Sequence, residues 1–291
     1  MVESRGLKLI KSNLEAIPLI DRFSRWLIEQ EKSDGTVETY KLVLTKFHEW
    51  LLRRSVKLGQ LTKNDIQGYM IYLESENKSA STIEKTFVTI NVFTRFLGKP
   101  EVVEGIKRKQ NQKNKQIVPE SLEINERDRL LHEVKQDGNL RDIAIVYTFL
   151  HTGIRVSEIC ALDRSDVEIN EHNGSLVILD AKGNKKRVVP LSKEVRYHLK
   201  KYIDSLNSTH DALFISNFNK RISQRTVQYM LKKYNVNPHK LRHTFCKELV
   251  QEGINIATVA ELAGHSDVNI TRRYSSLSTT DLEDAINNTF V

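Results

Sequence analysis

The sequence has few of the residues that mark disulfide-rich, disordered or membrane-spanning proteins. Its 291 residues include only 2 cysteines and 5 prolines, which disfavours a disulfide framework and extensive disorder. Cys160 and Cys246 lie far apart in apolar helical patterns, so we interpret both as core residues of a protein from a reducing cytoplasm. No apolar run approaches the roughly 20 residues that span a bilayer, and residues 1–13 hold no apolar stretch of signal-peptide length.

The motifs of nucleotide-dependent and metal-dependent chemistry are also missing. The sequence contains no G-x-x-x-x-G-K-[ST] phosphate loop, no H-E-x-x-H and no pair of cysteines at zinc-binding spacing. We therefore expect neither a cofactor nor a metal ion. Any phosphoryl chemistry must then stabilise charge with guanidinium groups and other hydrogen-bond donors, and it needs a side chain as nucleophile.

Charge, in contrast, is abundant and separated into blocks. The formal net charge is +8. Residues 1–115 and 182–247 carry +7 and +13, whereas residues 116–181 and 248–291 carry −7 and −5. A single short run of charge is usually a solvated face. A block of +13 favours a polyanionic partner, because each neutralised phosphate releases condensed counterions.

The length predicts two domains. Apolar residues at helical spacing predict four helices within residues 1–98, with Thr62 and either Ser79 or Ser81 as N-caps. Residues 99–119 are basic and lack an apolar period, which is typical of an extended linker and suits a strap along a phosphate backbone.

Residues 120–291 form the second predicted domain, which is again mostly helical. Gly153 is expected to end one of its helices. Two apolar stretches, 176–180 and 187–191, are predicted to be strands that flank the turn-forming Lys-Gly-Asn tripeptide at 182–184. The first domain is then a helical bundle, and the second combines helices with a small antiparallel sheet.

Three motifs in the second domain carry the chemistry. One is His-Thr-Gly-Ile-Arg-Val-Ser-Glu, which ends at Glu158, and another is Pro-His-Lys-Leu-Arg-His-Thr-Phe, which begins at Pro238. The third is Leu-Ala-Gly-His-Ser around His265, with Tyr274 nine residues further on. A histidine and an arginine three residues apart share one helix face, and a guanidinium can donate two parallel hydrogen bonds to a phosphate. Over residues 15–286 the chain resembles the tyrosine recombinases, or phage-type integrases.

The resemblance implies a set of site residues by matching position. The nucleophile falls on Tyr274, whose phenol must lose its proton to attack at neutral pH. The lysine that protonates the leaving oxygen falls on Lys182, with Lys185 as the alternative. His243 matches no catalytic position and is interpreted as a packing or supporting residue. The full implied set is Arg155, Lys182, His239, Arg242, His265 and Tyr274, with Glu158 in support.

The resemblance also implies a fold and a reaction. The fold is mainly α, a C-shaped clamp of a SAM-like core-binding domain and a catalytic domain that closes around duplex DNA. The reaction forms a 3′-phosphotyrosyl link and proceeds through a Holliday junction without metal or ATP. The compact layout favours a Xer-like enzyme or a transposon resolvase or integrase, acting in the cytoplasm on nucleoid DNA. The expected partners are four copies joined through the C-terminal tail, and an accessory protein or a second recombinase.

Two other functions fit parts of the pattern. A DNA-binding or architectural protein that never cleaves would share the basic blocks and the helical bundle, although it needs no tyrosine at position 274. A topoisomerase-like relaxing enzyme would share the pocket but would not require a tetramer. The tail could also dock on its own domain, since a short amphipathic helix must pack against a surface.

Overall fold

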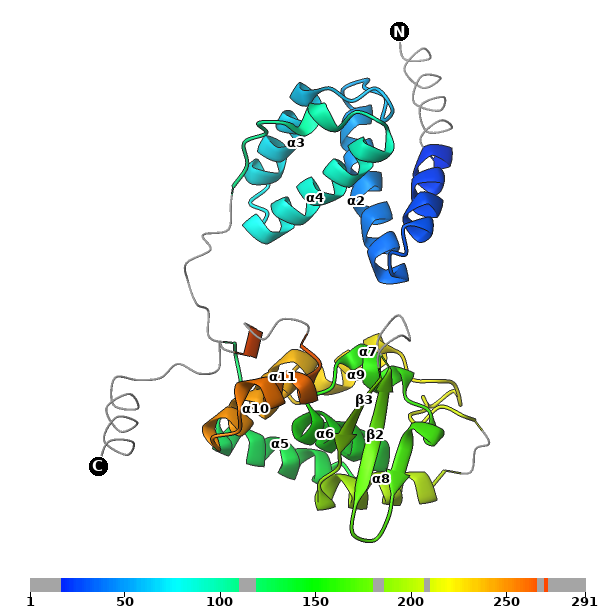
Figure 1. Ribbon diagram of the computed structural model, residues 1–291, viewed down its shortest axis with the longest axis vertical. Helices are drawn as coiled ribbons and strands as arrows, with labels where there is room; N and C mark the ends of the chain where they lie inside the picture. The colour runs from blue at the N-terminus through cyan, green and yellow to red at the C-terminus, as the bar shows by residue number, and fades with distance from the viewer. Residues whose placement is uncertain (1–16, 110–118, 180–185, 207–209, 266–269, 272–291) are drawn as a thin grey trace, which may run out of the picture. The chain divides into compact units, whose positions relative to one another are not determined.

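The computed structural model describes residues 17–109, 119–179, 186–206, 210–265 and 270–271, and these divide between two compact units, 1–115 and 116–291 (Figure 1). The units are mainly helical, as the sequence predicted. Within the described residues, no helix has the length and apolar character needed to cross a membrane.

The first unit is the four-helix bundle that the apolar spacing predicted. Its helices are residues 17–29, α2 (Asp34–Leu52), α3 (Lys63–Ser75) and α4 (Ala80–Phe96). Thr62 caps α3 in a reciprocal capping box with Asp65, and Ser79 rather than Ser81 caps α4. Phe23, Phe47 and Phe93 are fully buried between the helices, so aromatic packing holds the bundle together.

The basic segment after α4 differs from the expected linker, because its first half packs on the bundle. A 3₁₀ helix, η1, covers Pro100–Val103, and the side chain of Ile106 is buried. Arg108 forms two hydrogen bonds to the Glu84 carboxylate, at 2.7 and 3.0 Å, and its guanidinium lies 3.6 Å from the centre of the Phe87 ring. The composition of the segment did not indicate this packing, because the contacts come from a few isolated side chains rather than from a periodic apolar face.

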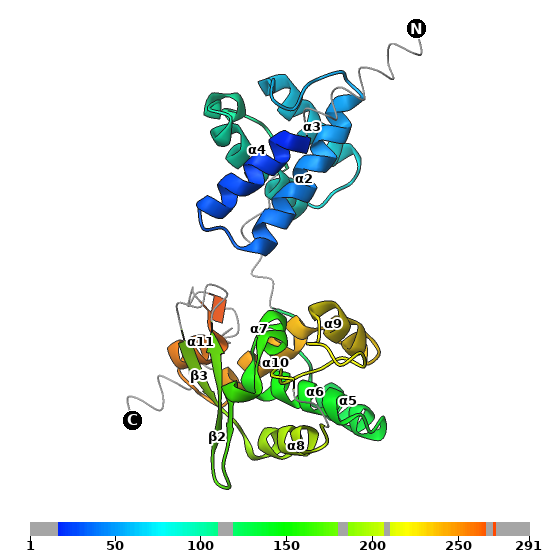
Figure 2. The same ribbon diagram turned by 90° about the vertical axis from the view of Figure 1, so that its right-hand side faces the viewer.

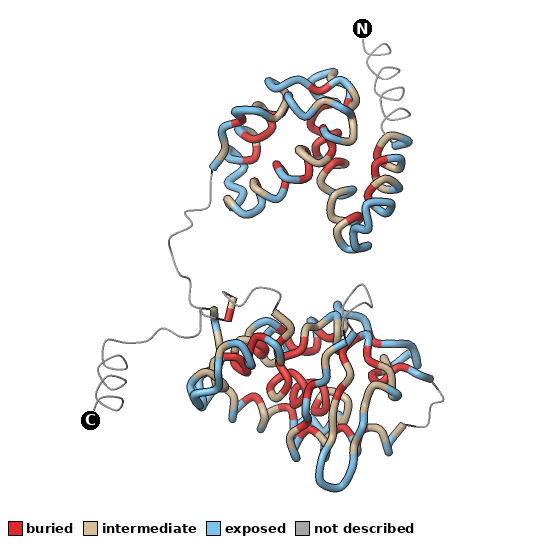
Figure 3. Tube along the Cα trace, in the orientation of Figure 1, coloured by how far each residue is buried: buried red, intermediate tan, exposed pale blue. Residues whose placement is uncertain are grey.

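The second unit surrounds one buried helix. Its elements are α5 (Ile124–Gln136), α6 (Leu140–Thr152), α7 (Val156–Ala161), η2 (Arg164–Asp166), β1 (Val167–Ile169), β2 (Gly174–Leu179), β3 (Lys186–Pro190), α8 (Lys193–Asp204), α9 (Gln224–Lys232), α10 (Pro238–Gln251) and α11 (Ile256–Ala263). Residues 143–150 of α6 are all buried, and Figure 3 shows these buried positions in the middle of the unit. A helix that is apolar on every side belongs at the centre of a core.

The sheet has three antiparallel strands in the order β1-β2-β3. The sequence predicted β2 and β3 within a residue or two at each end, but not β1, whose three residues are too few to show alternation. Leu179 pairs with Lys186 at one end of the hairpin and Ser175 pairs with Pro190 at the other. Both cysteines are buried, as predicted, and burial raises the pKa of Cys160 to about 11.

Candidate active site

The first arginine of the predicted set is placed by a glycine at the end of α6. Gly153 ends this helix with φ of +59°, a left-handed conformation that side chains disfavour. A Cβ atom there would lie 2.2 Å from Cδ1 of Phe245, so α10 packs directly on the glycine backbone. Two residues later Arg155 is the N-cap of α7, which holds its backbone at the junction of α6, α7 and α10.

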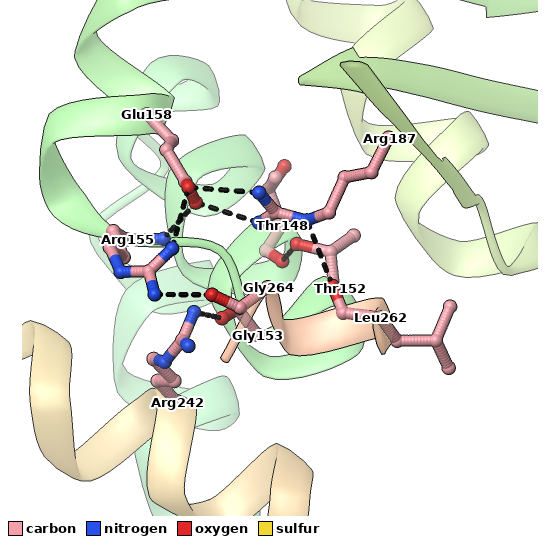
Figure 4. A network of polar contacts seen from close by, with 9 residues as sticks. All are labelled: Thr148, Thr152, Gly153, Arg155, Glu158, Arg187, Arg242, Leu262 and Gly264. Carbon is pink, nitrogen blue, oxygen red and sulfur yellow. Dashed lines mark hydrogen bonds and ion pairs between the residues drawn. The ribbon is translucent and has the colours of Figure 1, made fainter. Parts of the chain in front are cut away.

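Glu158 is the acceptor around which two arginines are arranged (Figure 4). Its Oε2 accepts hydrogen bonds from the Arg155 backbone N–H at 2.7 Å and from Nη2 of Arg187 at 2.8 Å. Its Oε1 accepts from Nη1 of each arginine at 2.9 Å. Burial alone would raise the pKa of Glu158, but hydrogen bonds and charge from Arg187 and Arg155 lower the pKa to about 2. The carboxylate is therefore ionised throughout the neutral range.

Arg187 connects this carboxylate to the last turn of α11. The residue is on β3, and its Nε donates to the carbonyl oxygen of Leu262 at 3.1 Å. A Cβ atom on Gly264 would lie 2.7 Å from the Arg187 guanidinium carbon, so the glycine admits this close approach. The sequence motifs did not indicate a role for Arg187. The usable signal was strand alternation, because residues 187 and 189 share the inward face of β3 and an inward arginine needs an anionic partner.

Arg242 approaches from α10, the helix that opens at Pro238 with Asn237 as its cap. Its side chain is buried, and Nη1 donates to the Gly153 carbonyl oxygen at 2.5 Å. Burial first, and then the positive charge of Arg155, lower the pKa of Arg242 to about 10. The guanidinium therefore remains charged at neutral pH. Figure 4 shows it beside Arg155, which donates to the Gly264 carbonyl.

His265 follows directly on Gly264 and faces the same cations. Its Nδ1 and the Thr271 hydroxyl are 2.8 Å apart, and no other described residue hydrogen-bonds the ring. Burial lowers the pKa of His265, and the charges of Arg242 and Arg155 lower it further, to about 4. The imidazole is neutral at pH 7, so it can donate or accept a hydrogen bond and can exchange a proton with a bound group.

The two histidines of α10 lie at the edge of this group. His239 is exposed, and its ring centre is 6.4 Å from that of His243 in a stacked arrangement. Burial and the neighbouring positive charges lower the pKa of His243 to about 4. His239 is one turn before Arg242 on the helix, but it makes no hydrogen bond to Arg155, Glu158 or Arg242 within the described residues.

Two predicted residues, Lys182 and Tyr274, lie outside the described residues. The pairing of Leu179 with Lys186 fixes the two strand ends between which Lys182 occurs in sequence. The structure thus brings together Arg155, Glu158, Arg242 and His265, adds Arg187, and keeps His239 at the edge.

This cluster carries more positive than negative charge. Two guanidinium groups, of Arg155 and Arg187, bond the one carboxylate, and a third, of Arg242, bonds the Gly153 carbonyl beside them. Three positive charges and one negative charge leave the cluster with a net charge of +2. The arginines come from α7, β3 and α10, so their positions depend on packing and not on a single flexible loop. Such a fixed cationic site suits a phosphodiester and, still more, the additional negative charge of its transition state.

Known protein families match both units of the chain. Residues 120–280 match the phage integrase family, and residues 20–100 match the SAM-like N-terminal domain of phage integrases. The chain belongs to the phage integrase family of tyrosine recombinases. The tyrosine recombinase XerD of Oceanobacillus iheyensis is 30% identical to it, and the match covers 91% of this chain and 95% of the relative. The tyrosine recombinase XerA of Thermococcus kodakarensis is 29% identical over 92% of this chain and 93% of the relative.

A solved structure shows that the fold of this tyrosine recombinase is shared as well. XerH site-specific recombinase bound to its difH substrate, in a pre-cleavage complex, superposes with a TM-score of 0.66. The match covers 86% of this chain and 78% of XerH, at 21% identity. At that identity the likeness concerns the fold, and the roles of individual residues depend on the geometry described above.

Proposed function

We propose that this tyrosine recombinase cleaves and rejoins duplex DNA at specific sites, with Tyr274 as the nucleophile. One observation carries the proposal. Arg155, Arg242 and the neutral His265 converge from separate elements on one site with two uncompensated positive charges. A protein that only binds DNA has no need of a fixed, partly buried arrangement of this kind.

The proposed step conserves bond energy. The Tyr274 oxygen attacks phosphorus and forms a 3′-phosphotyrosyl ester while the bond to the 5′ oxygen breaks. Lys182 donates the proton that the leaving 5′ oxygen needs, and an imidazole, His239 or His265, accepts the phenolic proton. Rejoining is the reverse attack by a 5′ hydroxyl from the partner duplex. Two such rounds pass through a Holliday junction without an external source of energy.

Arg155 and Arg242 are assigned to the two non-bridging oxygens of the phosphate. Their guanidinium groups are held before DNA binds by the carbonyls of Gly264 and Gly153. Such preorganisation avoids reorientation during the reaction, which is the main source of electrostatic catalysis. Glu158 and Arg187 are positioning residues in this proposal, because they fix Arg155 and the loop that carries His265.

DNA contact is assigned to the basic surface beside the site. On α9 Tyr229 is 80% exposed, and Arg225 and Lys232 are on the same short helix. Figure 2 shows α9 next to α7, and α9 belongs to the block of residues 182–247 with net charge +13. Lysine and arginine contacts of this kind dominate affinity for duplex DNA and make it dependent on salt.

A covalent trap tests the proposal. A duplex nicked near the cleavage position releases a short fragment on attack, so the phosphotyrosyl adduct cannot be reversed and accumulates. The wild type is expected to form this adduct, and Tyr274→Phe is expected to bind the duplex without forming it. Tyr234→Phe is the matched control, because its hydroxyl bonds Asp137 on the surface. An adduct that persists in Tyr274→Phe refutes the assignment, and a wild type that binds but never traps supports a non-cleaving DNA-binding protein.

Recombination also requires that subunits assemble on DNA. Four copies joined through their C-terminal tails, acting on nucleoid DNA in the cytoplasm, are part of the proposal. The tail in question is residues 278–291, where Leu282, Ile286 and Phe290 form a short apolar stripe. An accessory protein or a second, different recombinase would act with this assembly.

A further inference from the structure

A separate hollow lies between α5, α6 and α8. It has a volume of about 560 Å³, which is large enough for one or two apolar side chains. Its lining includes Leu140, Ile143 and Tyr147 of α6, and Ile143 and Tyr147 are buried. We call it the α8 pocket.

Aromatic rings form one side of the α8 pocket. The ring of His198 lies 4.1 Å from that of Tyr147, and Tyr197 meets His198 edge-on with ring centres 5.0 Å apart. Tyr197 is 60% exposed. An exposed tyrosine beside an apolar hollow is typical of binding surfaces, since its ring offers contact area at little cost in conformational entropy.

Three lysines line the same pocket. Lys135 is on α5, and Lys193 and Lys201 are on α8, against a single carboxylate from Glu194. Within the part of the chain that the structure describes, none of the three forms an ion pair. Burial lowers the pKa of His198, and the charges of Lys135 and Lys201 lower it further. The pocket is therefore apolar inside and positive at its edge.

The pocket is remote from the candidate active site within the second unit. Figures 1 and 2 both show α8 on the side away from α7 and α11, the elements next to Arg155 and Gly264. The candidate active site and the proposed DNA contact involve α7, α9 and α10, and no residue of these helices lines the pocket. A ligand in the α8 pocket would leave the reacting phosphate accessible.

We propose that the α8 pocket is a docking site for an acidic peptide segment of a partner protein, with a leucine or phenylalanine of that segment inserted between α6 and α8. Charge complementarity identifies the partner as acidic, because three lysines that form no ion pair with any described residue line the pocket with one carboxylate. The aliphatic lining from Leu140 and Ile143 favours a peptide side chain over a nucleic acid, whose backbone would contact the lysines without filling the hollow.

Binding of a defined probe tests this docking site. The probe is a fluorescein-labelled peptide of sequence Glu-Asp-Glu-Leu-Phe-Asp-Glu-Glu, titrated with the full chain and followed by fluorescence anisotropy. The double variant Lys135→Glu/Lys201→Glu is expected to weaken binding by about tenfold or more. Lys200→Glu is the matched control, because this exposed lysine is next to Lys201 but lines a neighbouring hollow instead. It is expected to change affinity by about threefold at most.

Two further probes separate the apolar contribution from charge. A peptide with Ser-Ser in place of Leu-Phe should bind at least about tenfold more weakly if a side chain enters the pocket. The proposal is overturned in favour of unspecific charge attraction if Lys200→Glu weakens peptide binding as much as the double variant does. The same conclusion follows if the Ser-Ser peptide binds as tightly as the Leu-Phe peptide. Displacement of the peptide by an unlabelled duplex overturns it in favour of nucleic acid, and no binding in the millimolar range overturns it outright. None of these results depends on DNA cleavage.

Discussion

Replacing Arg187 by glutamine removes a charge from the centre of the candidate active site and leaves a shorter, neutral amide in its place. In the wild type both terminal nitrogens of Arg187, Nη1 and Nη2, donate to the Glu158 carboxylate, and Nε donates to the Leu262 carbonyl. The variant leaves Glu158 with Arg155 as its remaining cationic partner. We expect a less stable second unit and a first unit that is unchanged.

The size of the loss follows from burial and from the pKa of Glu158. The exposed fractions of the Arg187 and Glu158 side chains are 17% and 9%, so solvent screens the pair little. Removing one partner of a buried pair costs about 3 to 5 kcal/mol, and the remaining bonds from Arg155 reduce this to about 2 to 4 kcal/mol. The pKa of Glu158, lowered from 4.5 to about 2, corresponds to about 3 kcal/mol of stability from all its partners together.

Urea unfolding of the full chain measures this loss with an internal control. Both tryptophans, Trp26 and Trp50, are in the first unit, so their fluorescence reports that unit alone. Far-ultraviolet circular dichroism reports both units. With a slope near 2 kcal/mol per molar urea, the second-unit transition of Arg187→Gln should move down by about 1 to 2 M, and the fluorescence transition should not move. Arg129→Gln is the matched control, because its 3.9 Å pair with Glu133 is largely exposed.

The pH dependence gives an independent check. A carboxylate whose pKa is lowered in the folded state adds stability above its unfolded pKa and loses this contribution as the pH falls through its folded value. The difference in stability between wild type and Arg187→Gln should therefore be complete above about pH 5 and shrink towards pH 2. A difference below about 1 kcal/mol at pH 7, or one that does not change with pH, would show that the pair does not organise the site.

Four further results are expected. Gly153→Ala should destabilise the second unit by about 2 kcal/mol or more in the same urea assay, because the new methyl group clashes with α10 and the residue has an unfavourable φ. Gly138→Ala is the matched control, because it adds only the φ strain and should cost about 1 kcal/mol. Arg242→Lys keeps a positive charge but loses the two parallel hydrogen bonds that a guanidinium donates. Trapping of the covalent adduct should therefore fall by about a hundredfold or more, with little change in duplex affinity in a gel-shift assay. An equal loss of trapping and of affinity would indicate that Arg242 only contacts the DNA backbone. Lys182→Ala should cleave slowly and be rescued by a substrate with a 5′-thio leaving group, which needs no proton, and absence of rescue assigns proton donation to another residue. Deletion of residues 278–291 should preserve single-site DNA binding and abolish tetramers and recombination, and tetramers of the truncated chain on DNA would refute the role of the tail.

The sequence by itself determined the elements whose signals are local. The four helices of the first unit followed from apolar spacing, and Thr62 identified the start of α3 because its capping box involves only neighbours. Gly153 ended α6 as predicted, since a glycine after an apolar helix is a local stop signal. The family followed in the same way, because its motifs are short runs of consecutive residues. The roles of Lys182 and Tyr274 remain predictions from those motifs.

Contacts between distant segments were decided only by the tertiary structure. Arg187 is 29 residues from Glu158, and nothing in the sequence pairs an arginine on a strand with a carboxylate on α7. The packing of residues 100–109 on the first bundle rests on Ile106 and on the contact of Arg108 with Glu84, which have no period to detect. The neutral state of His265 likewise depends on burial beside Arg242. Local patterns specify which elements form, but the free energy of a charge depends on which other charges the fold brings near it.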